Sequence, residues 1–296
     1  MPPRDARPSA MVNSMDSVRL ASVPYVNARP LTWGFTTGPY RAVFDVRMVP
    51  PSGIPALLRA GTIDVGLVPS IETLSLPEVE VLPHLCIATR RRARSVLLVS
   101  RPPVEEVRRI AVDVSSRTSV ALLRIILAGR GARDVVFEPR PPVLSAMLRD
   151  CEAALIIGDP ALAADTEGLR VMDLGAEWAA LTGLPFVFAL WAVRRGTFLP
   201  DGVRPFLESR QMGVANIARI ARDAAPRLGL EADSVESYLR TNIHYHLGTE
   251  EARGLELFLR KAADIGLAGD PGLLRFREGP GRTPATLTGS TARMIT

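Results

Sequence analysis

Short apolar runs alternate with helix-like patterns along the first hundred residues of the chain. The runs at 18–23, 43–49 and 64–68 predict strands, and the segment 54–60, which ends at Gly61, predicts a helix. This succession of strands and helices is typical of a mostly parallel sheet with helices on its faces. The pattern therefore predicts an α/β fold.

A second unit with the same rhythm follows, and the chain then returns to the first unit. Its predicted elements are strands at 95–100, 109–114, 134–137 and 153–157, helices at 116–128 and 143–149, a returning strand at 184–191, and a helical region at about 200–266. Two crossings, near Ser100 and near Phe188, indicate two lobes joined by a hinge, with a cleft between them.

The domain boundaries follow from these crossings. We expect lobe 1 to combine 18–100 with 188–270, and lobe 2 to comprise 101–187. The polar residues 1–17 predict a disordered leader, and 271–296, rich in Gly, Thr, Ser and Arg, predict a flexible tail.

Composition and charge exclude several classes of protein. The chain has 296 residues, 47% hydrophobic and 23% charged, which is enough for a substantial core. The net charge of +5 comes with only 5% aromatic residues, and the densest basic run, 90–94, is typical of a solvated loop, so we predict no nucleic-acid partner. Without a secretory signal or an apolar run of about 18 residues, we predict a cytoplasmic protein with no membrane partner. Nothing in the sequence indicates the oligomeric state.

Cysteine and histidine give no sign of a metal or a cofactor. Cys86 lies in an apolar segment and predicts a buried thiol, and with Cys151 it forms no CxxC pair. His84, His244 and His246 do not have the spacing of a zinc motif. We therefore expect neither a metal site nor a cofactor.

Small polar residues occur where the predicted strands end, and ligands of open α/β sheets bind beyond the carboxyl ends of strands. Hydroxyl and amide side chains and helix N-termini suit a small organic anion. Each position also has a structural alternative: Ser70 and Ser116 could be helix N-caps, and Asp159-Pro160 has the pattern of an N-cap followed by proline. The predicted cleft residues are Asn27, Ser70, Ser115, Ser116, Thr118, Ser119, Gly158, Asp159, Thr182 and Gly183.

Five segments together resemble the chorismate dehydratases of the futalosine route to menaquinone. They are 23–31 (VPYVNARPL), 61–70 (GTIDVGLVPS), 115–119 (SSRTS), 155–162 (LIIGDPAL) and 182–191 (TGLPFVFALW), and they occur in the order of that family. The resemblance spans roughly 18–266. It implies a type II periplasmic-binding-protein fold used as a cytoplasmic enzyme that removes water from chorismate to give 3-[(1-carboxyvinyl)oxy]benzoate.

The resemblance also implies that Asn27 and Ser95 face the substrate, and we assign them as catalytic. Asn27 is expected to bind the departing C4 hydroxyl or to orient the ring. Ser70 and Ser95 are expected to bind one carboxylate, and Ser116, Thr118 and Ser119 the other. Ser115, Asp159, Thr182 and Gly183 complete the predicted substrate-binding set. Because these segments contain no histidine or glutamate, the proton acceptor could be the substrate's own enolpyruvyl carboxylate.

Three other functions remain as alternatives. The 1,4-dihydroxy-6-naphthoate synthase of the same pathway shares the fold, but its first loop differs from residues 27–31 of this chain. A solute-binding protein without catalytic activity would need an export signal. A transcription regulator would need a helix-turn-helix, which 17 polar residues cannot form.

Overall fold

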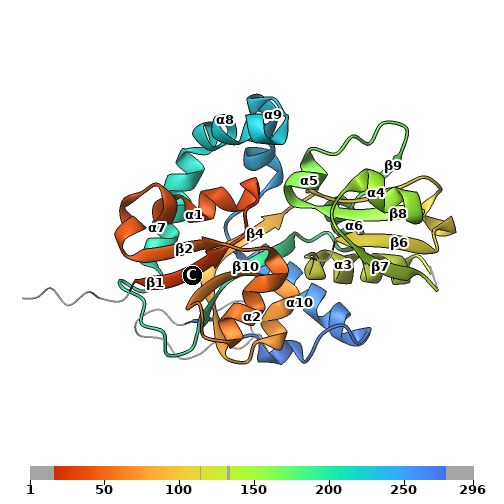
Figure 1. The fold of residues 1–296 in the computed structure, drawn as a ribbon. Coiled ribbons are helices and arrows are strands. Elements are labelled where there is room, and N and C mark those ends of the chain that lie inside the picture. Colours follow the sequence, from red (N-terminus) through yellow and green to blue (C-terminus); the bar gives the residue numbers. More distant parts are fainter. Residues whose placement is uncertain (1–16, 114, 132–133, 278–296) are drawn as a thin grey trace, which may run out of the picture.

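The computed structural model describes residues 17–113, 115–131 and 134–277, which form two five-stranded mixed sheets with helices around them (Figure 1). The first sheet has the order β2-β1-β3-β10-β4 and the second the order β7-β6-β8-β5-β9. The strands are β1 Val18–Ser22, β2 Phe44–Met48, β3 Val65–Pro69, β4 Val79–Thr89, β5 Val96–Ser100, β6 Arg109–Asp113, β7 Val136–Arg140, β8 Ala153–Ile157, β9 Arg170–Asp173 and β10 Phe186–Arg194.

The helices divide between the two sheets, and α8 and α9 lie at the top of the first lobe in Figure 1. The α-helices are α1 Arg29–Thr36, α2 Ile54–Arg59, α3 Arg117–Gly129, α4 Leu144–Asp150, α5 Gly158–Leu162, α6 Leu174–Thr182, α7 Arg204–Ala215, α8 Ile217–Leu228, α9 Ala232–Ser237 and α10 Thr249–Asp264. Among the described residues, no helix is both long and apolar enough to cross a membrane.

The α/β prediction and the two-lobed arrangement are confirmed. Each sheet contains three neighbouring strands that run parallel: β1 pairs with β2 and β3, and β6 pairs with β7 and β8. β10 and β5 run antiparallel to their neighbours, because each enters its sheet from the other lobe.

One strand, β5, belongs to a different lobe from the one predicted. β5, which we assigned to lobe 1, pairs with β8 and β9 in the second sheet. The first crossing is therefore at residues 90–95, not near Ser100, and the second is at 183–185, just before β10. The prolines Pro102 and Pro103, which suggested a linker, lie within the second lobe before β6. An apolar strand pattern predicts a strand but does not say which sheet contains it.

The ends of the chain also differ in part from the prediction. The predicted disordered leader lies outside the described residues except for Ser17. Residues 271–277, predicted as flexible, pack against the first sheet: Phe276 forms a parallel bridge with Val81, and Leu274 is buried. Arg277 Nη2 donates to the carbonyl oxygen of Thr197 at 2.8 Å. The rest of the predicted tail, 278–296, lies outside the described residues.

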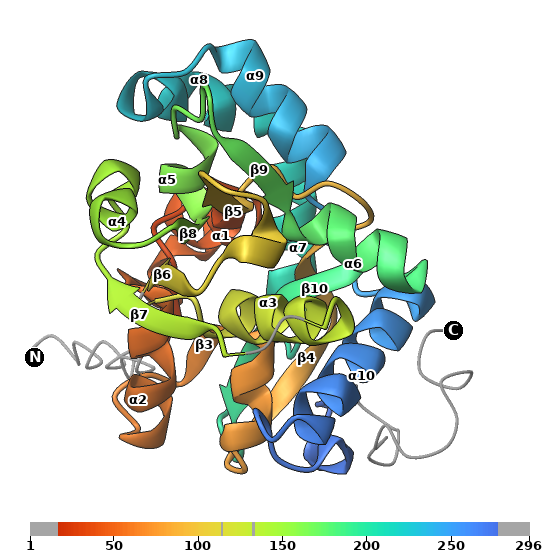
Figure 2. The same cartoon turned by 90° about the vertical axis from the view of Figure 1, so that its right-hand side faces the viewer.

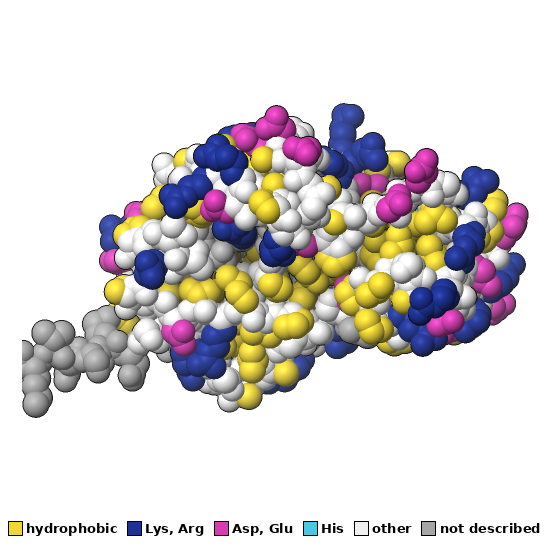
Figure 3. All heavy atoms as spheres, turned by 45° about the horizontal axis from the view of Figure 1, so that its top comes forward, with side chains coloured by type: hydrophobic (Ala, Val, Ile, Leu, Met, Phe, Trp, Pro, Cys, Tyr) yellow, Lys and Arg dark blue, Asp and Glu magenta, His cyan; other side chains and the backbone are white. Residues whose placement is uncertain are grey.

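A shared core ties the lobes together. One cluster of buried side chains contains residues of both sheets, such as Leu98, Ile110 and Leu190, together with Phe258 of α10. The helix α10 contacts both β10 and α3 (Figure 2). On the face seen in Figure 3, hydrophobic side chains gather along the middle of the molecule, with most charged side chains around them. The cleft between the lobes is therefore bordered by apolar surface.

The crossing of α1 and α7 fixes the first loop of the site. Ser209 Oγ of α7 accepts from the Gly34 N–H and donates to the Leu31 carbonyl oxygen, both at 2.8 Å. Because α1 begins directly after the 3₁₀ turn Val26–Ala28, this crossing sets the position of Asn27 in that turn.

Candidate active site

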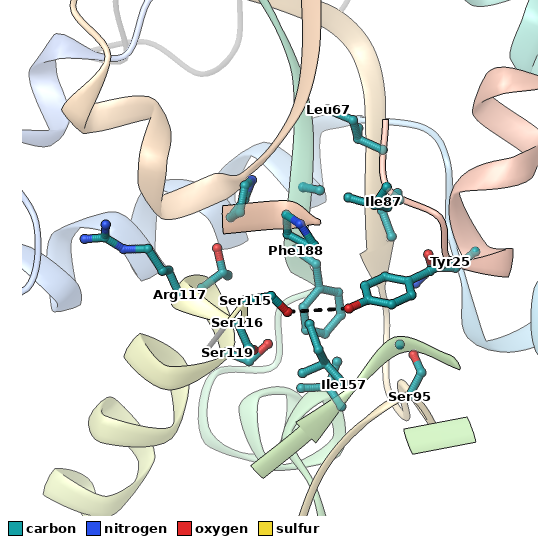
Figure 4. A pocket seen from close by; sticks show the side chains of 18 of the residues that line it. Tyr25, Leu67, Ile87, Ser95, Ser115, Ser116, Arg117, Ser119, Ile157 and Phe188 are labelled. Carbon is teal, nitrogen blue, oxygen red and sulfur yellow. Dashed lines mark hydrogen bonds between the residues drawn. The ribbon is translucent and has the colours of Figure 1, made fainter. Parts of the chain in front are cut away.

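A cavity between the lobes is lined by both of them and holds about 610 Å³ of atom-free space, including its open mouth. The residues that line it are Val23, Tyr25, Asn27, Pro51, Leu67, Pro69, Ile87, Ser95, Val96, Ser115, Ser116, Arg117, Thr118, Ser119, Ile157, Gly158, Phe188, Ala189 and Ile243. Figure 4 shows Ser115, Ser116 and Ser119 on one side, Tyr25 and Ser95 on the other, and Phe188 between them.

The N-terminus of α3 forms one polar wall of the cavity. Ser115 is held from behind, because Asp113 Oδ1 accepts from its backbone N–H at 2.9 Å and from its Oγ at 2.8 Å. Ser116 occupies the N-cap position of α3, as the structural alternative predicted, but its hydroxyl makes no capping hydrogen bond. Its Oγ is buried and has no hydrogen-bond partner among the described residues. An unpaired hydroxyl beside the N-terminus of a 13-residue helix suits an anionic ligand group.

Asn27 and Ser95 line the cavity on the side away from α3. Asn27 lies in the 3₁₀ turn after β1, and its Oδ1 is buried without a partner in the described part of the chain. Ser95 directly precedes β5, and its Oγ accepts a hydrogen bond from the Tyr238 hydroxyl at 2.7 Å. The structure thus brings together the two residues that we assigned as catalytic, although they are far apart in the sequence.

Tyr25 crosses the cleft beside Gly158. The Tyr25 hydroxyl lies 3.5 Å from Ser115 Oγ, and burial raises the pKa of Tyr25. Gly158 has a φ of +63°, and a Cβ there would lie 2.8 Å from the Tyr25 ring. Only glycine therefore allows the start of α5 to approach this ring.

Four further polar contacts join the lobes around the cavity. Arg117 Nε forms an ion pair with Glu72 Oε1 at 2.6 Å, and the Ile71 N–H donates to Thr118 Oγ1 at 3.3 Å. Asp159 Oδ1 accepts from the Val26 N–H, and its Oδ2 pairs with Arg227 Nη2, both at 2.8 Å. The two walls of the cavity are thus held against each other in this structure.

Four of the predicted substrate-binding residues do not line the cavity. Ser70 is fully buried, and its hydroxyl donates to the Val187 carbonyl oxygen at 2.8 Å, which ties the turn 70–75 to β10. Asp159 is not an N-cap, because α5 begins at Gly158 and Asp159 contacts the first lobe instead. Thr182 ends α6, where its hydroxyl donates to the Trp178 carbonyl oxygen, and Gly183 is the left-handed residue after that helix. We predicted no helix there, so both residues appeared to belong to a cleft loop.

Sequence reasoning assigned no role to four residues at this site. Tyr25, Arg117 and Phe188 lie within the quoted motifs and line the cavity. Tyr238 lies behind the cavity wall, in a region predicted only as helical, and makes a π-helical turn at Tyr238–Asn242. Such turns occur often at functional sites, but no sequence pattern marks this one.

The three histidines lie together, away from the cavity. The ring centroids of His84 and His246 are 6.0 Å apart, and those of His244 and His246 are 6.5 Å apart. Burial lowers the pKa of both His84 and His244, which favours neutral rings. Within the described ranges, no group of three or more His, Cys, Asp and Glu side chains is arranged to hold a metal ion. Cys86 is buried, as predicted.

Comparison with known proteins adds to this geometry. The family model for menaquinone biosynthesis matches residues 18–264. The chain belongs to this family. Within the menaquinone biosynthesis family, it is 31% identical to a protein named chorismate dehydratase from Thermus thermophilus, over 79% of this chain and 91% of that one. It is 25% identical to a chorismate dehydratase from Campylobacter jejuni, over 83% of this chain and 98% of that one.

Solved structures show the same fold at low sequence identity. A protein from Archaeoglobus fulgidus is similar with a TM-score of 0.68 and 18% identity, covering 85% of this chain and 98% of that one. The periplasmic aliphatic sulphonate binding protein of Escherichia coli has a TM-score of 0.61 and 16% identity, covering 91% and 97%. The periplasmic-binding-protein fold expected from the sequence is therefore confirmed.

Proposed function

We propose that this protein removes water from chorismate to give 3-[(1-carboxyvinyl)oxy]benzoate in menaquinone biosynthesis, and that it acts in the cytoplasm. The observation that carries the proposal is a single cavity lined by residues of all five segments that resemble the family and by Ser95. The similarity to two chorismate dehydratases supports the choice of substrate.

The two sides of the cavity suit different parts of this substrate. The N-terminus of α3, with Ser115, Ser116 and Ser119, binds one carboxylate. Asn27 and Ser95 lie together and bind the C4 hydroxyl, which revises the expectation that Ser95 binds a carboxylate. Phe188 and Ile157 lie between the two sides and pack against the ring.

The reaction needs positioning more than strong acid or base groups. The hydrogen at C3 is acidified by the ring carboxylate through the C1–C2 double bond. Its removal and the loss of the C4 hydroxyl complete an aromatic ring, so the product is stable. The cavity holds the reactive conformer and stabilises charge that develops on the ring carboxylate and on the departing oxygen.

We propose that the enolpyruvyl carboxylate of the substrate accepts the C3 proton. The residues that line the cavity include no carboxylate and no imidazole. Two aspartates lie behind the wall, and both hold the protein itself: Asp113 binds Ser115, and Asp159 binds Val26 and Arg227. Their places favour a structural role over proton transfer.

Asp159→Asn tests this assignment. We expect turnover to fall by less than about tenfold, because an amide oxygen can still accept the Val26 N–H and the lost ion pair is with an Arg227 side chain that is 55% exposed. Arg227→Gln is the matched control and should behave in the same way. A loss of about a thousandfold in kcat for Asp159→Asn alone, with substrate binding intact, would indicate a protein base.

The proposed activity itself is tested by incubating the purified protein with chorismate. We expect an aromatic absorbance to appear, with a product lighter than chorismate by one water in mass spectrometry. A solute-binding protein would bind chorismate and release it unchanged. The 1,4-dihydroxy-6-naphthoate synthase, a further alternative, would leave chorismate intact.

A further inference from the structure

Tyr238 lies behind the cavity wall, where it contacts both Asn27 and Ser95. Its side chain is 1% exposed, and it begins the π-helical turn that follows α9. Its hydroxyl donates to Ser95 Oγ at 2.7 Å, and the side chain of Asn27 lies beside the same hydroxyl, where it lowers the pKa of Tyr238. One buried phenol thus joins Ser95, at the end of the first crossing, to Asn27, in the loop after β1.

The direction of each hydrogen bond follows from the number of hydrogens present. The single hydroxyl hydrogen of Tyr238 goes to Ser95 Oγ, so the Tyr238 oxygen can only accept from Asn27. Only Nδ2 of the Asn27 amide can donate, and this leaves Asn27 Oδ1 free. Consistent with this, Asn27 Oδ1 is buried and has no partner among the residues that the structure describes.

The same counting applies to Ser95. Its oxygen accepts from Tyr238, so its own hydrogen remains available. The acceptor that it has in the structure is the Ala93 carbonyl oxygen at 3.4 Å, which is a long hydrogen bond. A ligand oxygen in the cavity could therefore take this hydrogen at little cost.

We propose that Tyr238 is a positioning residue that fixes Asn27 as an acceptor and Ser95 as a donor toward the hydroxyl group that leaves the substrate. This inference rests on the proposed function. The C4 hydroxyl donates to Asn27 Oδ1 and accepts from the Ser95 hydroxyl. When the C4–O bond breaks, its electron pair passes to the oxygen, and the hydrogen bond from Ser95 stabilises the negative charge that develops there. The hydroxide from C4 and the proton from C3 leave as one water.

The surroundings of Tyr238 keep its hydroxyl protonated, which the hydrogen bond to Ser95 requires. Burial raises the pKa of Tyr238, and the bonds with Ser95 and Asn27 offset only part of that rise. The phenol therefore stays protonated and remains a donor to Ser95 throughout the neutral pH range.

The experiment compares Tyr238→Phe with Tyr245→Phe. Tyr245 is also buried, with burial raising its pKa, but its hydroxyl has no hydrogen-bond partner in the described part of the chain. For Tyr238→Phe we expect kcat for chorismate to fall by roughly 10–100-fold, with KM within about threefold, because a bond made to the departing oxygen is weakened. Tyr245→Phe should match the wild type in both constants. Equal kcat values for the two variants would overturn the proposal.

A double variant separates positioning from a general effect on the fold. Because Tyr238 acts through Ser95 and Asn27, adding Tyr238→Phe to Ser95→Ala should lower kcat by much less than it does in the wild type. Independent, fully multiplicative losses would contradict the coupling.

A crystal structure of Tyr238→Phe tests the orientation without relying on turnover. We expect the Ser95 hydroxyl or the Asn27 amide to adopt a different rotamer, with the wild-type rotamers kept in Tyr245→Phe. If the wild-type protein leaves chorismate unchanged, the proposed function fails, and these rotamers still decide the positioning role. Unchanged rotamers in Tyr238→Phe would refute it.

Discussion

Asn27→Leu is expected to lower chorismate turnover by roughly 10²–10³-fold, since removal of one group that binds the reacting oxygen typically costs this much. Asn27 lines the cavity, and its Oδ1 has no partner in the residues described. Leucine keeps a similar shape but can neither accept nor donate a hydrogen bond. Steady-state kinetics with chorismate measure the loss, which should fall mainly on kcat.

The same variant should change stability little. A buried polar atom without a partner costs free energy, and Asn27→Leu removes such an atom, but it also removes the interaction of the Asn27 amide with Tyr238. We therefore expect the urea midpoint to stay close to that of the wild type. Asn216→Ala is a control, because Asn216 Nδ2 donates to the Met212 carbonyl oxygen outside the cavity. It should lose stability and keep activity. A large loss of stability in Asn27→Leu would mean that Asn27 is a structural residue.

Local patterns allowed many of the elements to be predicted from the sequence. The runs at 18–23, 64–68, 109–114 and 153–157 became β1, β3, β6 and β8, within one or two residues at each end. These strands are short and mostly apolar, as expected where both faces of a sheet are covered. Their polar ends supplied the residues of the cavity at Asn27 and at 115–119.

The missed elements lacked such a pattern. β4 contains Pro83 and also His84, whose φ is +64°, so its apolar character did not indicate a strand of 11 residues. α6 carries apolar residues on most of its surface and therefore lacks the one-sided pattern of a surface helix. Its omission led to the wrong placement of Thr182 and Gly183.

Contacts between distant segments could not be predicted. Ser70, Asp159 and Tyr238 each bind an atom more than 60 residues away in the chain, and these partners decide whether each residue lines the cavity. Composition and residue spacing give information only about residues that are close together in the sequence. The strand ends showed where a site could form, and tertiary packing selected which side chains reach it.

Among the variants proposed for this protein, Gly213→Ala is expected to lose the most stability, because the added methyl group would push α1 away from α7. A Cβ at Gly213 would lie 2.5 Å from the carbonyl carbon of Pro30 and closer still to its oxygen, which are backbone atoms of α1. Neither helix can move aside without breaking the bonds of Ser209 to Gly34 and Leu31. We expect a loss of about 3 kcal/mol or more in the free energy of unfolding, and a fall in Tm of about 6–12 °C.

Gly129→Ala is the matched control for this prediction. Gly129 ends α3, and a Cβ there would meet no atom within 4 Å. Alanine loses less backbone entropy on folding than glycine, so this variant should gain up to about 1 kcal/mol. Thermal and urea unfolding of both variants provide the comparison. Because α1 begins next to Asn27, Gly213→Ala should also lower turnover below the melting temperature. Equal stability of the Gly213→Ala protein and the wild type would mean that the two helices are farther apart than in this structure.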